Sequence, residues 1–153
     1  MKKKWQIAKP VSGEHLQRFP EVNPVVVQLL YNRGLTTQEQ VDEFLNPDYS
    51  QDIHDPFLFR DMKKAVKRIF QAIKADEKIT VHGDYDADGV SASVILVSTL
   101  QELGATVDVY IPHRMSEGYG LNTNTVAELK KRGTSLIVTV DCGISSIEEV
   151  TMA

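Results

Sequence analysis

The period of apolar and polar positions changes near residue 60. From residue 62 to residue 73, apolar residues recur three and four positions apart, which predicts an amphipathic helix of about four turns with a basic opposite face. Short apolar runs then alternate with helical patterns. Strands are predicted at 78–82, 106–111 and 136–140, and helices at about 89–103 and 125–132. This βαβαβ order predicts an α/β fold with a parallel sheet and right-handed crossovers.

The N-terminal third of the chain has helical periods only. The stretch 23–33 predicts an apolar helix, with Pro24 in its first turn and Gly34 just past its end. Thr36 and Glu39 have the spacing of a capping box and predict a second short helix after them. We therefore expect a short helical N-terminal region before the sheet.

This change of pattern divides the chain into two parts. We expect residues 1–59 to form the helical region and a connector, because 49–59 follow no period. Residues 60–153 are expected to form the first part of an α/β domain.

The C-terminal end of the chain predicts one more helix. Ser145 or Ser146 is followed three residues later by Glu148 or Glu149, a capping-box spacing. A three-stranded parallel sheet needs cover on both faces and edges, so we expect this chain to be part of a longer protein.

Composition narrows the class of protein. The 153 residues include one cysteine, so an internal disulfide is excluded, and cysteine-rich zinc spacings are absent. No apolar run reaches the about 18 residues of a membrane span and no signal peptide is evident, so we expect a cytoplasmic protein without membrane contact. Cys142 is expected to be a small buried residue. The formal charge of −4 gives no global attraction to nucleic acid.

Acidic residues gather after two of the predicted strands. Asp84, Asp86 and Asp88 follow the first strand at alternating positions, His82 precedes them, and Asp141 follows the third strand. The carboxyl ends of parallel strands share one edge of a sheet, so all four carboxylates meet there if these two strands are neighbours. Mutual repulsion would make hard divalent cations their natural counter-charge.

Three other interpretations fit some of the same residues. The aspartates could form a solvated turn in which one of them caps the next helix. The Asp84-x-Asp86-x-Asp88-Gly pattern also matches the start of an EF-hand calcium loop, but the twelfth position, which should be glutamate, is Ile95. A haloacid-dehalogenase-like phosphatase would need its nucleophilic aspartate directly at the strand end, and here four residues intervene.

The octapeptide His82-Gly-Asp-Tyr-Asp-Ala-Asp-Gly89 resembles the DHH phosphoesterase superfamily. The likeness extends to further segments of the chain: Leu30-Tyr-Asn-Arg-Gly-Leu, Phe44-Leu-Asn-Pro, Asp61-Met-Lys-Lys-Ala-Val-Lys-Arg-Ile, Ile111-Pro-His-Arg, Glu117-Gly-Tyr-Gly-Leu and Val140-Asp-Cys-Gly-Ile. It implies a hydrolase that cleaves phosphodiesters with two Mn²⁺ or Mg²⁺ ions.

The resemblance also implies a role for each acidic residue. His82 and Asp86 correspond to ligands of one metal, Asp88 to a ligand of the other, and Asp141 to the carboxylate that bridges both. Asp84 supports these ligands or adds a further carboxylate. The Asp-His-His triplet of the superfamily and its later metal-binding aspartate are absent, so only part of each metal shell is present. We therefore expect this chain to be inactive alone.

The function implied for the complete protein is that of a single-stranded-DNA-specific 5′-to-3′ exonuclease in recombination and repair. Single-stranded DNA and other repair proteins are the expected partners. The alternatives are a nucleotide- or nucleic-acid-binding module without completed chemistry, and a phosphodiesterase of the same superfamily that cleaves oligonucleotides or cyclic dinucleotides.

Local charge adds candidates for DNA contact. Residues 60–78 contain seven basic residues against three acidic ones, although a solvated helix face would have the same composition. The candidates on this helix are Lys63, Lys67 and Arg68. Those in the loop after the second strand, which could meet a phosphate or stack on a base, are His113, Arg114, Tyr119 and Gly120. Tyr119 could equally be a packed anchor of its loop.

Overall fold

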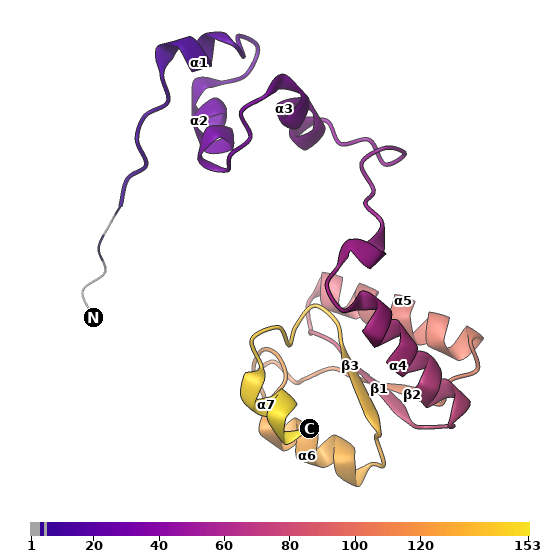
Figure 1. Ribbon diagram of the computed structural model, residues 1–153. Coiled ribbons are helices and arrows are strands. Elements are labelled where there is room, and N and C mark those ends of the chain that lie inside the picture. Colours follow the sequence, from indigo (N-terminus) through magenta and orange to yellow (C-terminus); the bar gives the residue numbers. More distant parts are fainter. Residues whose placement is uncertain (1–3, 5) are drawn as a thin grey trace. The chain divides into compact units, whose positions relative to one another are not determined.

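The computed structural model describes residue 4 and residues 6–153 (Figure 1). The chain forms two compact units, the first ending at Leu58 and the second comprising Phe59–Ala153. In the described part of the chain, no helix is both long enough and apolar enough to cross a membrane.

The first unit is helical, as its pattern predicts. Its elements are α1 (Gly13–Gln17), α2 (Pro24–Asn32), α3 (Gln38–Leu45) and the 3₁₀ turn η1 (Pro56–Leu58). A small core of Phe19, Val27, Leu30 and Val41 holds the three helices together. The five-residue helix α1 was not predicted, because it is too short to show a helical period.

The capping box of α3 differs from the predicted one. The side chains that cap the helix are Thr37 and Gln40, not Thr36 and Glu39. Gln40 N–H donates to Thr37 Oγ1 at 3.3 Å, and Gln40 Oε1 accepts from Thr37 N–H at 3.2 Å. This register buries Val41 in the core of the unit, and that burial decides between two otherwise similar caps.

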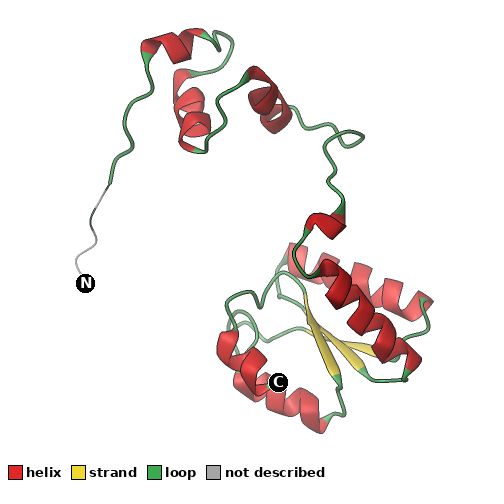
Figure 2. Ribbon diagram, viewed as in Figure 1, coloured by secondary structure: helices red, strands yellow, loops and turns green. Residues whose placement is uncertain are grey.

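The second unit is an α/β fold with the predicted βαβαβ order. The elements are α4 (Met62–Lys74), β1 (Ile79–His82), α5 (Ala87–Glu102), β2 (Val107–Tyr110), α6 (Thr123–Lys131), β3 (Leu136–Thr139) and α7 (Ile147–Met152). The three strands are parallel in the order β2-β1-β3, so β1 is central (Figure 2). The strands followed by the acidic residues, β1 and β3, are therefore neighbours, and the α/β prediction is confirmed.

The sheet, with β1 at its centre, separates two layers of helices. Ile79 and Val81 are fully buried in a core with Ala72 of α4 and Leu100 of α5. Alternation along a strand turns Thr80 and His82 to the opposite face. Helices α4 and α5 lie on the first face of the sheet and α6 and α7 on the second (Figure 1). The two polar residues of β1 therefore lie under the second layer.

Helix α7 begins without the predicted capping box. Ser146 is its N-cap residue but makes no side-chain cap hydrogen bond. The preceding turn is closed by main-chain bonds, from Ser146 N–H to Gly143 O and from Ile147 N–H to Ser145 O. Since the turn itself sets the start of the helix, the Ser-x-x-Glu spacing is not used here.

Candidate metal centre

Three carboxylates meet at the carboxyl ends of β1 and β3. Asp84 and Asp86 lie on the loop between β1 and α5, and Asp141 lies just after β3. Each offers an oxygen atom, and these three atoms lie within 4.8 Å of one another. Hard oxygen ligands at this spacing suit a divalent cation.

Asp84 is the buried member of the three. Its side chain is 2% exposed, and Oδ1 has no hydrogen-bond partner among the described residues. A buried carboxylate oxygen without a donor is costly unless a cation or water satisfies it. The unpartnered Oδ1 of Asp84 therefore fits a site that binds a metal ion.

Two glycines let helix α5 pack directly against this loop. A Cβ at Gly89 would lie 2.7 Å from the Asp84 carbonyl oxygen, and one at Gly83 would lie 2.0 Å from Ser93 Oγ. Both distances are shorter than real Cβ contacts. The absence of side chains at these two positions is therefore what brings Asp84 against the first turn of α5.

Asp86 is held by the start of α5. Its side chain accepts a hydrogen bond from Gly89 N–H at 3.1 Å and so caps the helix. This bond is the main cause that holds the pKa of Asp86 below its usual value. Asp86 therefore caps α5, as the solvated-turn alternative expected of one aspartate. The cap holds its carboxylate at the sheet edge where β1 and β3 end.

Asp141 has a left-handed backbone with a φ of 58°, which is uncommon for a residue other than glycine. The Tyr119 hydroxyl donates to the main-chain oxygen of Asp141 at 3.0 Å. Partial desolvation by the neighbouring protein, followed by the negative charge of Asp88 and then of Asp86, raises the pKa of the exposed Asp141. The carboxylate thus lies in a negative field that a cation would relieve.

Residues 78–153 match the DHH family, N-terminal domain. This segment belongs to the DHH family. The chain is 44% identical over 154 residues to the single-stranded-DNA-specific exonuclease RecJ of Bacillus subtilis, covering 99% of this chain and 20% of that protein. It is 35% identical over 130 residues to RecJ of Thermus thermophilus, covering 85% of this chain and 18% of the relative. The chain is homologous to the N-terminal part of RecJ and spans about a fifth of its length.

Several solved structures resemble the chain, and two of them are RecJ structures with manganese. A crystal structure of exonuclease RecJ bound to manganese has a TM-score of 0.56 and 42% identity, over 60% of this chain and 23% of that one. The crystal structure of Thermus thermophilus RecJ in complex with Mn²⁺ has a TM-score of 0.54 and 29% identity, over 91% and 18%. For residues 78–153, the family match and these likenesses favour the DHH-family interpretation over the calcium-loop and haloacid-dehalogenase alternatives.

The structure gathers only some of the predicted ligands of the DHH-family segment. Asp86 and Asp141 lie together, and Asp84 joins them. Asp88 is exposed in the first turn of α5, outside this group of three but close enough for its charge to act on Asp141. His82 also lies outside the group.

His82 is fully buried at the end of β1. Its ring stacks on Tyr110, with centroids 5.5 Å apart and planes 18° apart. Burial is the main cause that lowers the pKa of His82, so the ring favours its neutral form. Nδ1 lies 3.6 Å from Cys142 Sγ, whereas Nε2 is buried without a partner in the described part of the chain.

The basic candidates on α4 differ in their contacts. Arg68 Nη2 lies 2.5 Å from Glu77 Oε2, so its charge already has a partner within the unit. Lys63 and Lys67 are exposed, and neither forms an ion pair with any residue that the structure describes. Of the three, the lysines are the ones left open to solvent.

The loop candidates after β2 also have protein contacts. The Arg114 guanidinium lies over the Tyr85 ring at 5.2 Å, and His113 Nδ1 lies 3.0 Å from Ser116 Oγ. Gly120 is buried with a φ of 83°. The Tyr119 hydroxyl donates a hydrogen bond to the main-chain oxygen of Asp141. This contact favours the interpretation of Tyr119 as an anchor of its loop.

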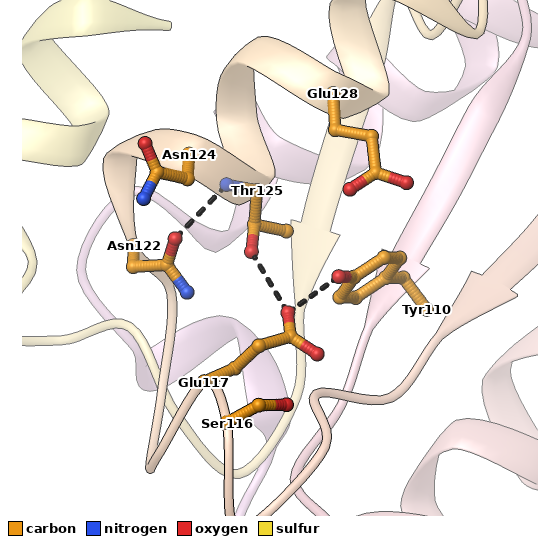
Figure 3. A pocket seen from close by; sticks show the side chains of 7 residues that line it. All are labelled: Tyr110, Ser116, Glu117, Asn122, Asn124, Thr125 and Glu128. Atoms are coloured by element: carbon orange, nitrogen blue, oxygen red, sulfur yellow. Dashed lines mark hydrogen bonds between the residues drawn. The ribbon is translucent and has the colours of Figure 1, made fainter.

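Glu117 is a residue whose role the sequence patterns did not indicate. Its carboxylate accepts from the Tyr110 hydroxyl at 2.5 Å and from the Thr125 hydroxyl at 3.3 Å (Figure 3). It also accepts from His113 N–H at 2.7 Å. It lines a polar cavity of about 400 Å³ between the loop and the start of α6. Its three donors come from β2, the loop and α6, so Glu117 ties the loop to the sheet. In the sequence, Glu117 stands directly before the Gly118-Tyr-Gly120 segment.

Proposed function

We propose that the complete protein is a metal-dependent exonuclease that degrades single-stranded DNA in the 5′-to-3′ direction during recombination and repair. One observation carries the proposal: the carboxylates of Asp84, Asp86 and Asp141 lie within 4.8 Å of one another in a segment of the DHH family. The homology to proteins named single-stranded-DNA-specific exonucleases supports the substrate class. Residues 60–153 are then the first part of the catalytic domain, and 1–59 are its helical N-terminal region and connector.

The proposed metal ligands come from both strand ends. His82 and Asp86 would hold one Mn²⁺ or Mg²⁺ ion, Asp88 the second, and Asp141 would bridge the two. Asp84 adds a buried carboxylate beneath them. Support comes from two buried atoms without partners in the described residues, His82 Nε2 and Asp84 Oδ1, because each is a lone-pair donor that a cation would satisfy.

The residues of this chain would have two roles in the proposed reaction, which are to position the metal ligands and to contact DNA. Bound divalent ions supply charge neutralisation and a water of lowered pKa for attack at phosphorus. Asp86 keeps its place because the first turn of α5 holds it, and Asp141 keeps its place because Tyr119 holds its main chain. Lys63 and Lys67 are the proposed contacts to the DNA backbone, since their charges have no acidic partner in the described structure.

The test uses the complete protein with single-stranded and double-stranded DNA labelled at either end, in Mn²⁺. We expect release of the 5′ label from single strands, loss of this activity in Asp86→Asn and unchanged activity in Asp42→Asn, whose carboxylate lies on α3. DNA binding without metal-dependent cleavage would overturn the proposal and favour a binding module. Cleavage of short oligonucleotides or cyclic dinucleotides alone would favour another phosphodiesterase of the superfamily.

A further inference from the structure

The two nitrogen atoms of the His82 ring have different surroundings. Nδ1 lies 3.6 Å from Cys142 Sγ, across 60 positions of the chain. Nε2 is buried and has no hydrogen-bond partner among the residues described. The same thiol lies 3.7 Å from the main-chain oxygen of His82. Cys142 thus contacts both the ring and the backbone of one buried histidine.

Only one arrangement of hydrogens uses both contacts of the Cys142 thiol. If Nε2 carried the proton, it would be a buried donor without an acceptor, which is costly. If Nδ1 carries it, the ring donates to Cys142 Sγ, and the thiol S–H donates to the His82 carbonyl oxygen. The lone pair of Nε2 is then free. A neutral imidazole binds metals through such a lone pair.

We propose that Cys142 is a positioning residue that holds His82 in the Nδ1–H tautomer and presents the Nε2 lone pair to the metal ion. This inference rests on the proposed function, in which His82 is a ligand. A ligating histidine generally donates its other N–H to a group outside the metal shell, and loss of that group weakens metal binding by about 10- to 100-fold. Here a thiol takes the place of the more usual carboxylate or carbonyl.

The stacked Tyr110 ring supports the same geometry. It lies against the His82 ring at 5.5 Å and 18°, and its hydroxyl is fixed by Glu117. The stack restrains the tilt of the imidazole, but it provides no partner for either nitrogen in the ring plane. The choice of tautomer therefore falls to Cys142.

The first experiment reads the tautomer without metal. In the ¹⁵N-labelled 153-residue chain, long-range ¹H–¹⁵N spectra distinguish a protonated from an unprotonated ring nitrogen, and His82→Gln identifies the signal. We expect the Nδ1–H form in the native chain and in Cys142→Ser, and a shift towards Nε2–H in Cys142→Ala. Val140→Ala is the control, since it removes packing nearby but no polar contact with the ring. A native Nε2–H form would overturn the proposal.

The second experiment measures Mn²⁺ affinity in the complete protein from the electron paramagnetic resonance signal of free Mn²⁺. Cys142→Ala should weaken binding by about 10- to 100-fold, with Cys142→Ser restoring most of it and Val140→Ala leaving it unchanged. Equal affinity in Cys142→Ala and the native protein, with weaker binding in Asp86→Asn, would overturn the role of Cys142 alone. Absence of Mn²⁺ binding in the native protein would overturn the proposed function as well. A loss in Cys142→Ser as large as in Cys142→Ala would make the sulfur itself a ligand, against the proposal.

Discussion

Replacement of Gly89 by alanine tests how closely helix α5 must fit the acidic loop. Gly89 is buried in the first turn of α5. A Cβ there would lie 2.6 Å from Asp84 Cβ and 2.7 Å from the Asp84 carbonyl oxygen. Both are atoms at or next to the backbone, so neither can rotate away. The added methyl group fits only if the helix and the loop move apart.

The size of the effect follows from these distances. Ordinary contact begins at 3.4 Å, so the helix must retreat by roughly 0.7 Å, which forfeits about a quarter to a half of the attraction across that interface. Such overpacking costs about 1–3 kcal/mol, and the better helix propensity of alanine offsets about 1 kcal/mol. We expect a net loss of up to about 2 kcal/mol in the free energy of unfolding. The loop carrying Asp84 shifts with it, so exonuclease activity should fall by about 10- to 100-fold.

Hydrogen exchange on peptides that cover α5 measures the first effect, and a nuclease assay on the complete protein measures the second. The matched control is Gly13→Ala, because a Cβ at Gly13 of α1 meets nothing within 4 Å. Exchange in α1 should be unchanged or slower in that variant. If Gly89→Ala slowed exchange in α5 in the same way and left activity intact, the close fit of loop and helix would be refuted.

Three further predictions concern groups around the site. Tyr119→Phe keeps the ring and removes the hydroxyl that holds Asp141, so Mn²⁺ affinity should fall by about 3- to 10-fold; an unchanged titration would return Tyr119 to the DNA candidates. Joint replacement of Lys63 and Lys67 by alanine should flatten the slope of log affinity for single-stranded DNA against log salt by about 1.4, and an unaltered slope would mean a merely solvated face. The bond from Tyr110, followed by that from His113 N–H, holds the pKa of Glu117 below 4.5. Its stabilisation is therefore complete above about pH 4.5 and is lost as pH falls through the folded-state pKa. Glu117→Gln should then unfold at a lower temperature than the native chain at neutral pH, with the gap closing in acid; a constant gap in melting scans would contradict this.

The fold could be predicted because its signals are local and repeated. Each strand is a short β-branched run, and each crossover helix has an apolar period, so the βαβαβ order follows from neighbouring residues. The gathering of Asp86 and Asp141 followed in turn from parallel topology, which places the carboxyl ends of β1 and β3 on one edge. The order of the strands is a long-range property that local patterns do not determine. The sequence therefore predicted that the aspartates meet only on the condition that β1 and β3 are neighbours.

The alternating spacing of the three aspartates does not place all of them in one group. Alternate residues share a face only in an extended chain. The chain is extended at Asp86 but turns into helix α5 at Ala87, and each helical residue rotates by about 100°. Asp88 therefore lies outside the group that Asp84, Asp86 and Asp141 form. Where the helix begins is decided by the cap at Asp86, a detail that spacing alone does not reveal.

The anchoring of the three carboxylates explains why their charges can stand so close together. Asp86 accepts from a helix N-terminus, and its pKa is lowered. Asp141 is placed through its main chain by Tyr119, and its pKa is raised. Asp84 is buried with an oxygen that has no partner in the described residues. Protein donors thus fix the side chain of Asp86 and the main chain of Asp141. Much of the charge of the three carboxylates is left uncompensated by the described residues, which is the arrangement expected of a site that a divalent cation completes.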